Sequence, residues 1–367
     1  MIRRISLTVV LVVGVVWVAA TFVFGLWSKA PAADRLTNNL NAAFTPAAIA
    51  QEHADAVAVN GLATDLSTTT VPLVGRLTHA SDAQAAALLA TTWPTVGRLL
   101  STRDDAGRPF ANGQTYVQNA ADYVTAVAGT IQAERPSFLQ AEQIPIKSLP
   151  AQALTWLFVI LGLVTLAIGG VFIWKPDLAR PLGAALVALG LVVVAVTLII
   201  NVPGKTQSVD NVTNAFRPVF ATSGPLSIDQ GQRYLTAVGA ADQTLSTQLV
   251  PTLATLLDTT PGNVTGVLST NDPVLVNALF GRDAVNPQVS PLRGILQRWN
   301  GLAAVVVSQR SNFSKVDAIP GWGMPATMVQ FLLVVPALLL ALAGIGWIVP
   351  PLGKPHPVAT YGHPAAT

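Results

Sequence analysis

The 367-residue chain contains no cysteine, so disulfide bonds and thiolate metal sites are excluded. Charge is also scarce, because Asp, Glu, Lys and Arg make up 11% of the residues, against roughly 25% in an ordinary soluble domain. Hydrophobic residues make up 51% of the chain. This composition is typical of a protein that places much of its surface in lipid.

Four uncharged apolar stretches account for the excess, and the residues between them are polar. As helices these stretches are each about 30 Å long, which matches the hydrocarbon core of a bilayer. We therefore predict an all-α integral membrane protein with four transmembrane helices, at 6–27, 152–174, 181–202 and 327–349. The lack of ionisable groups within the spans disfavours a self-sufficient ion- or proton-coupled transporter.

The basic residues predict how the chain crosses the membrane. Segments 1–5, 175–180 and 350–367 hold five basic residues and one acid, whereas 28–151 and 203–326 hold both signs in similar number. Because short cytoplasmic loops retain Lys and Arg, we predict that both termini and the 175–180 hairpin are cytoplasmic. Segments 28–151 and 203–326 would then be extracytoplasmic domains, and the Pro-rich tail 350–367 is expected to be disordered.

An alternative is that the first span is a cleaved secretory signal, because Ala30-Pro31-Ala32 resembles a cleavage site. We favour a retained anchor, since the apolar run is long for a signal.

The chain repeats its own pattern at an offset of about 175 residues. The matched positions include Asp34 with Asp210, Asn38 with Asn214, Phe44 with Phe220, Asp104 with Asp272, and Phe138 with Phe313. This pattern predicts an internal duplication of a unit made of a transmembrane helix, a helical extracytoplasmic domain and a second transmembrane helix. We interpret the matched aspartates as helix-capping groups rather than ligand contacts.

Leucine and valine residues three and four apart predict that the polar segments are helical. The expected helices are 33–44, 47–78, 81–101 and 112–141, then 209–220, 227–257, 262–270 and 288–315. Ser227 is expected to cap the helix that follows it. Pro145, Pro150, Pro320 and Pro325 should interrupt any helix that continues into the next span.

Small residues within the spans predict a packing surface. The candidates are Gly162, Gly169, Gly170, Ala184, Ala188, Gly344 and Gly346. They would serve either the protein's own four helices or a docking face for another membrane subunit, and the sequence leaves both open. Trp156, Trp322 and Trp347 lie near the predicted span ends, where we expect them to anchor the helices at the interface.

Catalytic, cofactor-binding and metal sites are not expected. His53 lies near Glu52 and Asp55, but the second repeat has no matching histidine. The run ending Gly204-Lys205-Thr206 resembles a phosphate loop, yet Ile199 occupies the place of its first glycine. The net charge of +3 reflects the flanks of the spans and gives no reason to expect nucleic-acid binding.

In topology and in its Ala-, Val- and Thr-rich, cysteine-free composition, the chain resembles uncharacterised envelope membrane proteins of mycobacteria and other actinobacteria. Some of these, of the LucB type, are accessory subunits of Mce-type lipid importers. The resemblance implies an inner-membrane location and membrane-protein partners. It rests on no signature motif, so it carries over no functional residue.

Three functions fit these observations. The first is a non-catalytic accessory or scaffold subunit of a bacterial cell-envelope complex, with membrane lipids and other membrane subunits as partners. The second is a sensor that binds a ligand through tandem helical ectodomains, and the third is a lipid-handling transport component. An apolar groove would favour lipid handling.

Overall fold

The computed structural model describes residues 2–144, 146 and 149–349. These residues form helices joined by loops, and the only β-type pairing among them is an isolated bridge between Arg103 and Pro109. The predicted tail 350–367 and Pro145 lie outside the described residues. The expectation of an all-α protein is confirmed for the part of the chain that the structure describes.

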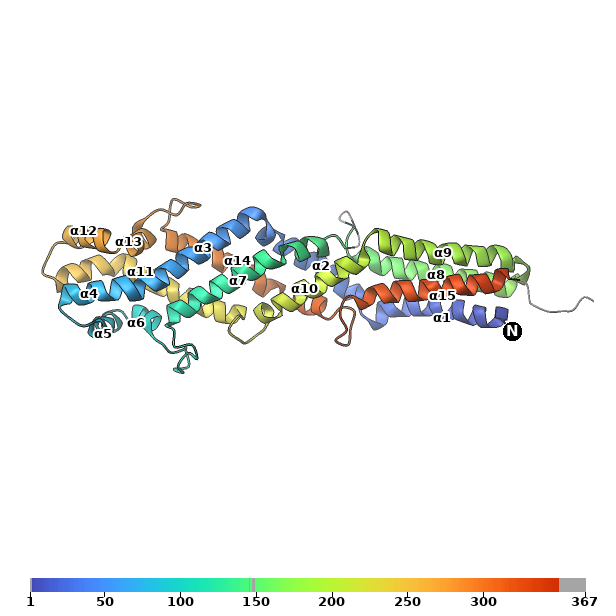
Figure 1. Cartoon of the computed structure of the whole chain (residues 1–367), viewed down its shortest axis with the longest axis horizontal. Coiled ribbons are helices and arrows are strands. Elements are labelled where there is room, and N and C mark those ends of the chain that lie inside the picture. Colours follow the sequence, from blue (N-terminus) through green and yellow to red (C-terminus); the bar gives the residue numbers. More distant parts are fainter. Residues whose placement is uncertain (1, 145, 147–148, 350–367) are drawn as a thin grey trace, which may run out of the picture. The chain divides into compact units, whose positions relative to one another are not determined.

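The four predicted spans are helices α1 (Ile2–Val23), α8 (Gln152–Trp174), α9 (Ala179–Ile199) and α15 (Met328–Ile348). Each is long and apolar enough to cross a membrane. They belong to a compact unit made of the described residues within 2–31, 143–210 and 318–349, which we call the span bundle. Within it, α9 packs against α15 and α1 packs against α8 and α15. The start of α1 and the turn between α8 and α9 lie at the same end of the bundle (Figure 1).

Residues 32–142 and 211–317 form the second compact unit, which we call the polar unit. Its first segment contributes α3 (Pro46–Asp65), the π-helical turn η2 (Leu66–Thr70), α4 (Val71–Thr78), α5 (Asp82–Thr92), α6 (Pro94–Leu100) and α7 (Tyr116–Ala141). Its second segment contributes α11 (Ile228–Leu256), α12 (Pro261–Asn271), α13 (Pro273–Phe280) and α14 (Pro291–Asp317). Two helices, α2 (Leu26–Leu40) and α10 (Val202–Phe220), contribute residues to both units.

Helices from the two polar segments pack against one another in this unit. Helix α11 of the second segment contacts α6 and α7 of the first, and α13 contacts α3. Two stacked phenylalanine pairs lie in its core, Phe44 with Phe138 at 3.9 Å between ring centroids and Phe220 with Phe313 at 4.1 Å. The two segments therefore share one packed unit.

Proline and capping residues explain most helix boundaries. Ser227 accepts a hydrogen bond from the Gln230 amide at 3.3 Å, which confirms the expected start of α11. The predicted helix 81–101 is wrong as one element, because Pro94 forces Trp93 into an extended conformation and separates α5 from α6. Helix α13 was not expected, and Pro273 separates it from α12 in the same way.

Interruptions before the second and fourth spans are confirmed. Helix α7 ends at Ala141 and α8 begins at Gln152, while α14 ends at Asp317 and α15 begins at Met328. Pro150, Pro320 and Pro325 lie in these gaps, where a missing backbone donor costs no helical hydrogen bond.

Large buried side chains fill the span bundle. Trp17 and Trp347 are fully buried, and Trp17 donates from Nε1 to the Leu332 carbonyl at 2.9 Å. Trp347 stacks on Phe172 with 4.0 Å between ring centroids. The expectation that Trp347 is an interfacial anchor is therefore wrong, because its ring lies in the helix core, whereas Trp156 and Trp322 are exposed.

The candidate packing residues divide into two groups. Gly162 and Gly169 are buried against α1, and Gly344 is buried against α9. Ala184, Ala188 and Gly170 are exposed on the outside of the bundle, and Gly346 is half-buried. On α9 the close contacts to α15 are made by Gly183 and Gly190, which the sequence pattern did not single out.

We predict that Gly190→Ala destabilises the span bundle, because the added Cβ would lie 2.4 Å from the Ala337 carbonyl oxygen. Overpacking of this kind costs about 1–3 kcal/mol. Thermal unfolding of the full-length protein in nanodiscs, followed by circular dichroism, should show a lower midpoint. Gly170→Ala is the matched control, since its Cβ would meet no atom within 4 Å. Equal midpoints for the two variants would contradict the close contact.

Candidate ligand groove and its charged ends

An apolar groove of about 350 Å³ lies in the polar unit between α3, α13 and α14. Its volume falls within the roughly 300–1,000 Å³ of small-molecule sites. The lining residues are Ala58, Val59, Gly61, Leu62, Pro273, Val274, Asn277, Ala278, Pro291, Leu292 and Ile295. Asn277 is the only one of them with a polar side chain, so the groove suits an apolar ligand.

Small side chains keep the groove open. A Cβ on Gly61 would meet no atom within 4 Å, and Ala58 and Ala278 also leave room on the α3 and α13 walls. Val274 is 45% exposed although it is apolar. An apolar surface that faces water in this way gains free energy when an apolar partner covers it.

A buried ion cluster lies one helical turn from the groove on both α3 and α14. Arg298 follows Ile295 by three residues and donates to both carboxylate oxygens of Asp55, at 2.8 and 2.7 Å. It also donates to both oxygens of Asp283, at 3.0 and 2.8 Å. Both carboxylates are almost fully buried, and both depend on the same guanidinium, because a buried charge without a partner is strongly unfavourable.

Electrostatics of this cluster follow from its burial. The hydrogen bonds to Asp55 raise the pKa of Arg298 further above its ordinary value. Burial opposes ionisation of Asp283, but its hydrogen bonds from Arg298 and from backbone amides lower its pKa overall. Burial, together with the charge of Asp55, raises the pKa of nearby Glu52 to about 7. The cluster is therefore a fixed ion pair system with one protonatable neighbour.

A pair of carboxyl groups lies close to the groove where α3 ends and α13 begins. Asp272 is fully buried and accepts from the Thr70 hydroxyl at 2.6 Å and from the Leu275 amide at 3.0 Å. The carboxyl group of Asp65, the last residue of α3, is its neighbour. Burial and this second carboxyl raise the pKa of Asp272 to about 6.

The other repeat-matched residues have separate local roles. Asp272 caps α13 as expected, but Asp104 closes a turn by accepting from the Ala106 and Arg108 amides, so its predicted role as a helix cap is wrong. Asp210 accepts from the Ala326 and Thr327 amides before α15. Asp34 is half-buried, and Asn38 and Asn214 are exposed. The structure does not gather these residues into one site.

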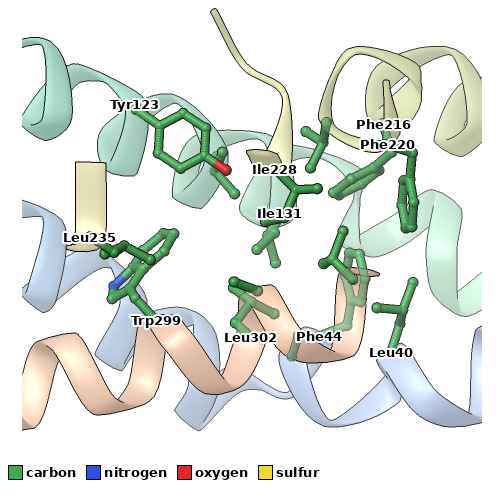
Figure 2. A pocket seen from close by; sticks show the side chains of 15 residues that line it. Leu40, Phe44, Tyr123, Ile131, Phe216, Phe220, Ile228, Leu235, Trp299 and Leu302 are labelled. Carbon is green, nitrogen blue, oxygen red and sulfur yellow. The ribbon is translucent and has the colours of Figure 1, made fainter. Parts of the chain in front are cut away.

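A second, smaller cavity of about 30 Å³ lies among the helices of the polar unit (Figure 2). Apolar side chains line it, among them Phe44, Phe216 and Phe220. Space of this size holds about two water molecules. Two of its lining residues, Tyr123 and Trp299, bury a polar atom that has no partner. We interpret this cavity as part of the core, since it is too small for a lipid chain.

Among the described residues, no group of three or more His, Asp or Glu side chains is arranged to hold a metal ion. His53 and Glu52 lie on α3, but His53 is exposed, whereas Asp55 is buried and paired with Arg298. Little in the sequence indicates the groove, because its three walls are far apart along the chain. The only local signals were Gly61 within a helix and the Pro273 break.

The described chain is thus a helical protein with four candidate membrane-spanning helices and an apolar groove in its polar unit. No family model, curated protein or solved structure matches it.

We predict that Arg298→Met destabilises the polar unit strongly, because it leaves Asp55 and Asp283 buried without a cation. Removal of one partner from a buried ion pair costs about 3–5 kcal/mol. Urea unfolding of the full-length protein, read by pulse proteolysis, would measure this loss. The control is Arg217→Met, whose pair with Asp317 is solvent-exposed and should cost about 1 kcal/mol or less. Similar losses in both variants would contradict the central role of Arg298.

Proposed function

We propose that the protein is a non-catalytic, lipid-binding accessory subunit of a membrane complex in a bacterial cell envelope. The observation that carries this proposal is the open groove of about 350 Å³ between α3, α13 and α14. An apolar groove in the polar unit of a membrane-anchored chain suits the acyl part of a lipid.

The span bundle supports the accessory role. Its helices contain no ionisable residue in their predicted membrane segments, so they offer no path for a coupling ion. Ala184, Ala188 and Gly170 face outward, and small residues let another membrane helix approach closely. A separate permease or energising subunit would supply the functions that these four helices lack, as the resemblance to Mce-associated proteins implies.

The same proposal includes a parallel internal duplication and an inner-membrane orientation with both termini cytoplasmic. The duplication is supported by the two stacked phenylalanine pairs, because Phe44 and Phe138 occupy the sequence positions that match Phe220 and Phe313. The orientation is supported by basic residues in two places, Arg3 and Arg4 at the start of α1 and Lys175 and Arg180 at the turn between α8 and α9. The start of α1 and this turn lie at the same end of the span bundle (Figure 1). Both polar segments would then lie outside the cytoplasm.

Cysteine labelling tests this topology, since the natural chain has no cysteine. We expect Arg103→Cys and Asn271→Cys each to react with a membrane-impermeant maleimide in intact spheroplasts. Asp177→Cys, in the hairpin, should react only after lysis. Labelling of positions 103 and 271 from opposite sides would rule out a parallel duplication.

Lipid binding is tested by filling the groove. We expect Gly61→Phe to place its ring in the groove and to lower the amount of lipid that co-purifies with the full-length protein in mild detergent. Gly129→Phe on α7 is the matched control, because a Cβ at either glycine meets no atom within 4 Å. Lipidomics of both variants and the natural chain gives the readout, and equal lipid content in all three would count against the groove.

The same purification identifies the partner. Membrane subunits recovered in near-equal amounts with the natural chain would support the accessory role and name the complex. Recovery of the protein alone, with lipid bound, would favour the second candidate, a self-contained lipid-handling transport component.

A further inference from the structure

We propose that the groove takes an uncharged amphiphile, such as a long-chain alcohol or a monoacylglycerol, and excludes lipids with a charged head group. This inference rests on the function proposed above and adds the chemical class of the ligand. It follows from the charged groups at the two ends of the groove and from Asn277, the one polar side chain in its lining.

The carboxylates at the end near the ion cluster are already supplied with donors. Asp55 accepts from Arg298 and from the Gln51 side-chain amide, the latter at 2.8 Å. Asp283 accepts from Arg298 and from two backbone amides, each at 3.1 Å. Both carboxylates are buried and every one of their four oxygens has a donor. A cationic head group would therefore find no free acceptor at this end.

An anionic head group would find no buried cation at the same end. All three guanidinium nitrogens of Arg298 donate to Asp55 or Asp283. Glu52, one helical turn before Asp55 on α3, adds a further acid. The neighbouring Arg282 is exposed, and water weakens the attraction of an exposed charge. A carboxylate or phosphate placed here would lose its hydration among acidic groups, which is strongly unfavourable.

The other end of the groove, where α13 begins, is also acidic. Asp272 directly precedes the lining residue Pro273 and is fully buried. One of its oxygens accepts from the Thr70 hydroxyl at 2.6 Å and the other from a backbone amide at 3.0 Å. Arg293, which lies among the lining residues of α14, pairs with Asp242 at 3.5 Å. This end therefore offers neither a free cation nor a free acceptor to a charged head group.

Asn277 provides the polar contact between these two ends. It lies on the α13 wall, and its side-chain amide forms no hydrogen bond with the other residues that the structure describes. Gly281, one turn further on, leaves space for this amide, because a Cβ there would clash with Oδ1 of Asn277. An amide both donates and accepts hydrogen bonds, so it can bind a hydroxyl or an ester group without any charge being buried.

Photo-crosslinking of the full-length protein in nanodiscs tests this selection. The probes are a diazirine-bearing long-chain alcohol, an alkyl sulfate and an alkyltrimethylammonium of the same chain length, and the last two are charged at every pH. Mass spectrometry gives the ratio of groove crosslinks to span-bundle crosslinks, which corrects for how much of each probe enters the bilayer. We expect this ratio to be about tenfold higher for the alcohol than for either charged probe, because burial of an unpaired charge is costly.

The three probes also separate this inference from the proposed function. Equal ratios for all three, or a higher ratio for the sulfate or the ammonium probe, would overturn the selection and leave lipid binding standing. Groove crosslinks absent with every probe would overturn lipid binding, and the selection with it.

A substitution at Asn277 tests the polar contact. Asn277→Leu removes the amide and keeps a side chain of similar size, so we expect the groove ratio of the alcohol to fall about fivefold, which corresponds to the loss of one hydrogen bond. Asn60→Leu is the matched control, since Asn60 is exposed on α3 and does not line the groove. An alcohol ratio that is the same in both variants would overturn the role of Asn277.

Arg282 provides the sharpest test against an anionic ligand. It follows the lining residue Ala278 by four positions and forms no salt bridge within the described part of the chain. We expect Arg282→Gln to leave the ratios of all three probes unchanged. Strong crosslinking of the sulfate in the natural chain that this variant abolishes would assign an anionic head group to Arg282 and overturn the proposal.

Discussion

The salt bridge between Arg298 and two buried aspartates is the contact on which the polar unit most depends. Asp55 comes from the first polar segment, whereas Arg298 and Asp283 come from the second. None of the three groups is stable alone in the interior, because an uncompensated buried charge costs several kcal/mol. The two segments must therefore meet in one register, and that register places α3 beside α14 and creates one side of the groove.

Polar contacts between the segments are found toward both ends of the groove. At one end Arg298 pairs with Asp55, and at the other the Thr70 hydroxyl of the first segment donates to Asp272 of the second. Between these two contacts the groove walls are lined mainly by apolar side chains. A groove can stay open there because the charged cluster holds the segments together and Gly61 leaves the space unfilled. Stability and binding capacity thus come from different residues of the same helices.

Much of the helical structure could be predicted from the sequence. The four spans were predicted within a few residues, because a long uncharged run has no other stable form in lipid. Ser227 and the prolines before α8 and α15 marked helix limits through local chemistry. The break at Trp93 is not part of the prediction, although Pro94 indicates it. Helix α13 is also not predicted, because a helix of eight residues shows too little periodicity to be recognised.

The sequence by itself determined the four apolar helices, the helical character of the polar segments and the lack of cysteine chemistry, because these depend on composition and on neighbours within a few residues. Only the tertiary structure decided that Gly183 and Gly190, rather than Ala184 and Ala188, pack against α15, and that Trp347 lies in the core. It also decided the pairing of Arg298 with Asp55, 243 residues away, and with it the groove. Such contacts join residues that are distant along the chain, and side-chain spacing within one helix cannot specify which distant helix will face it.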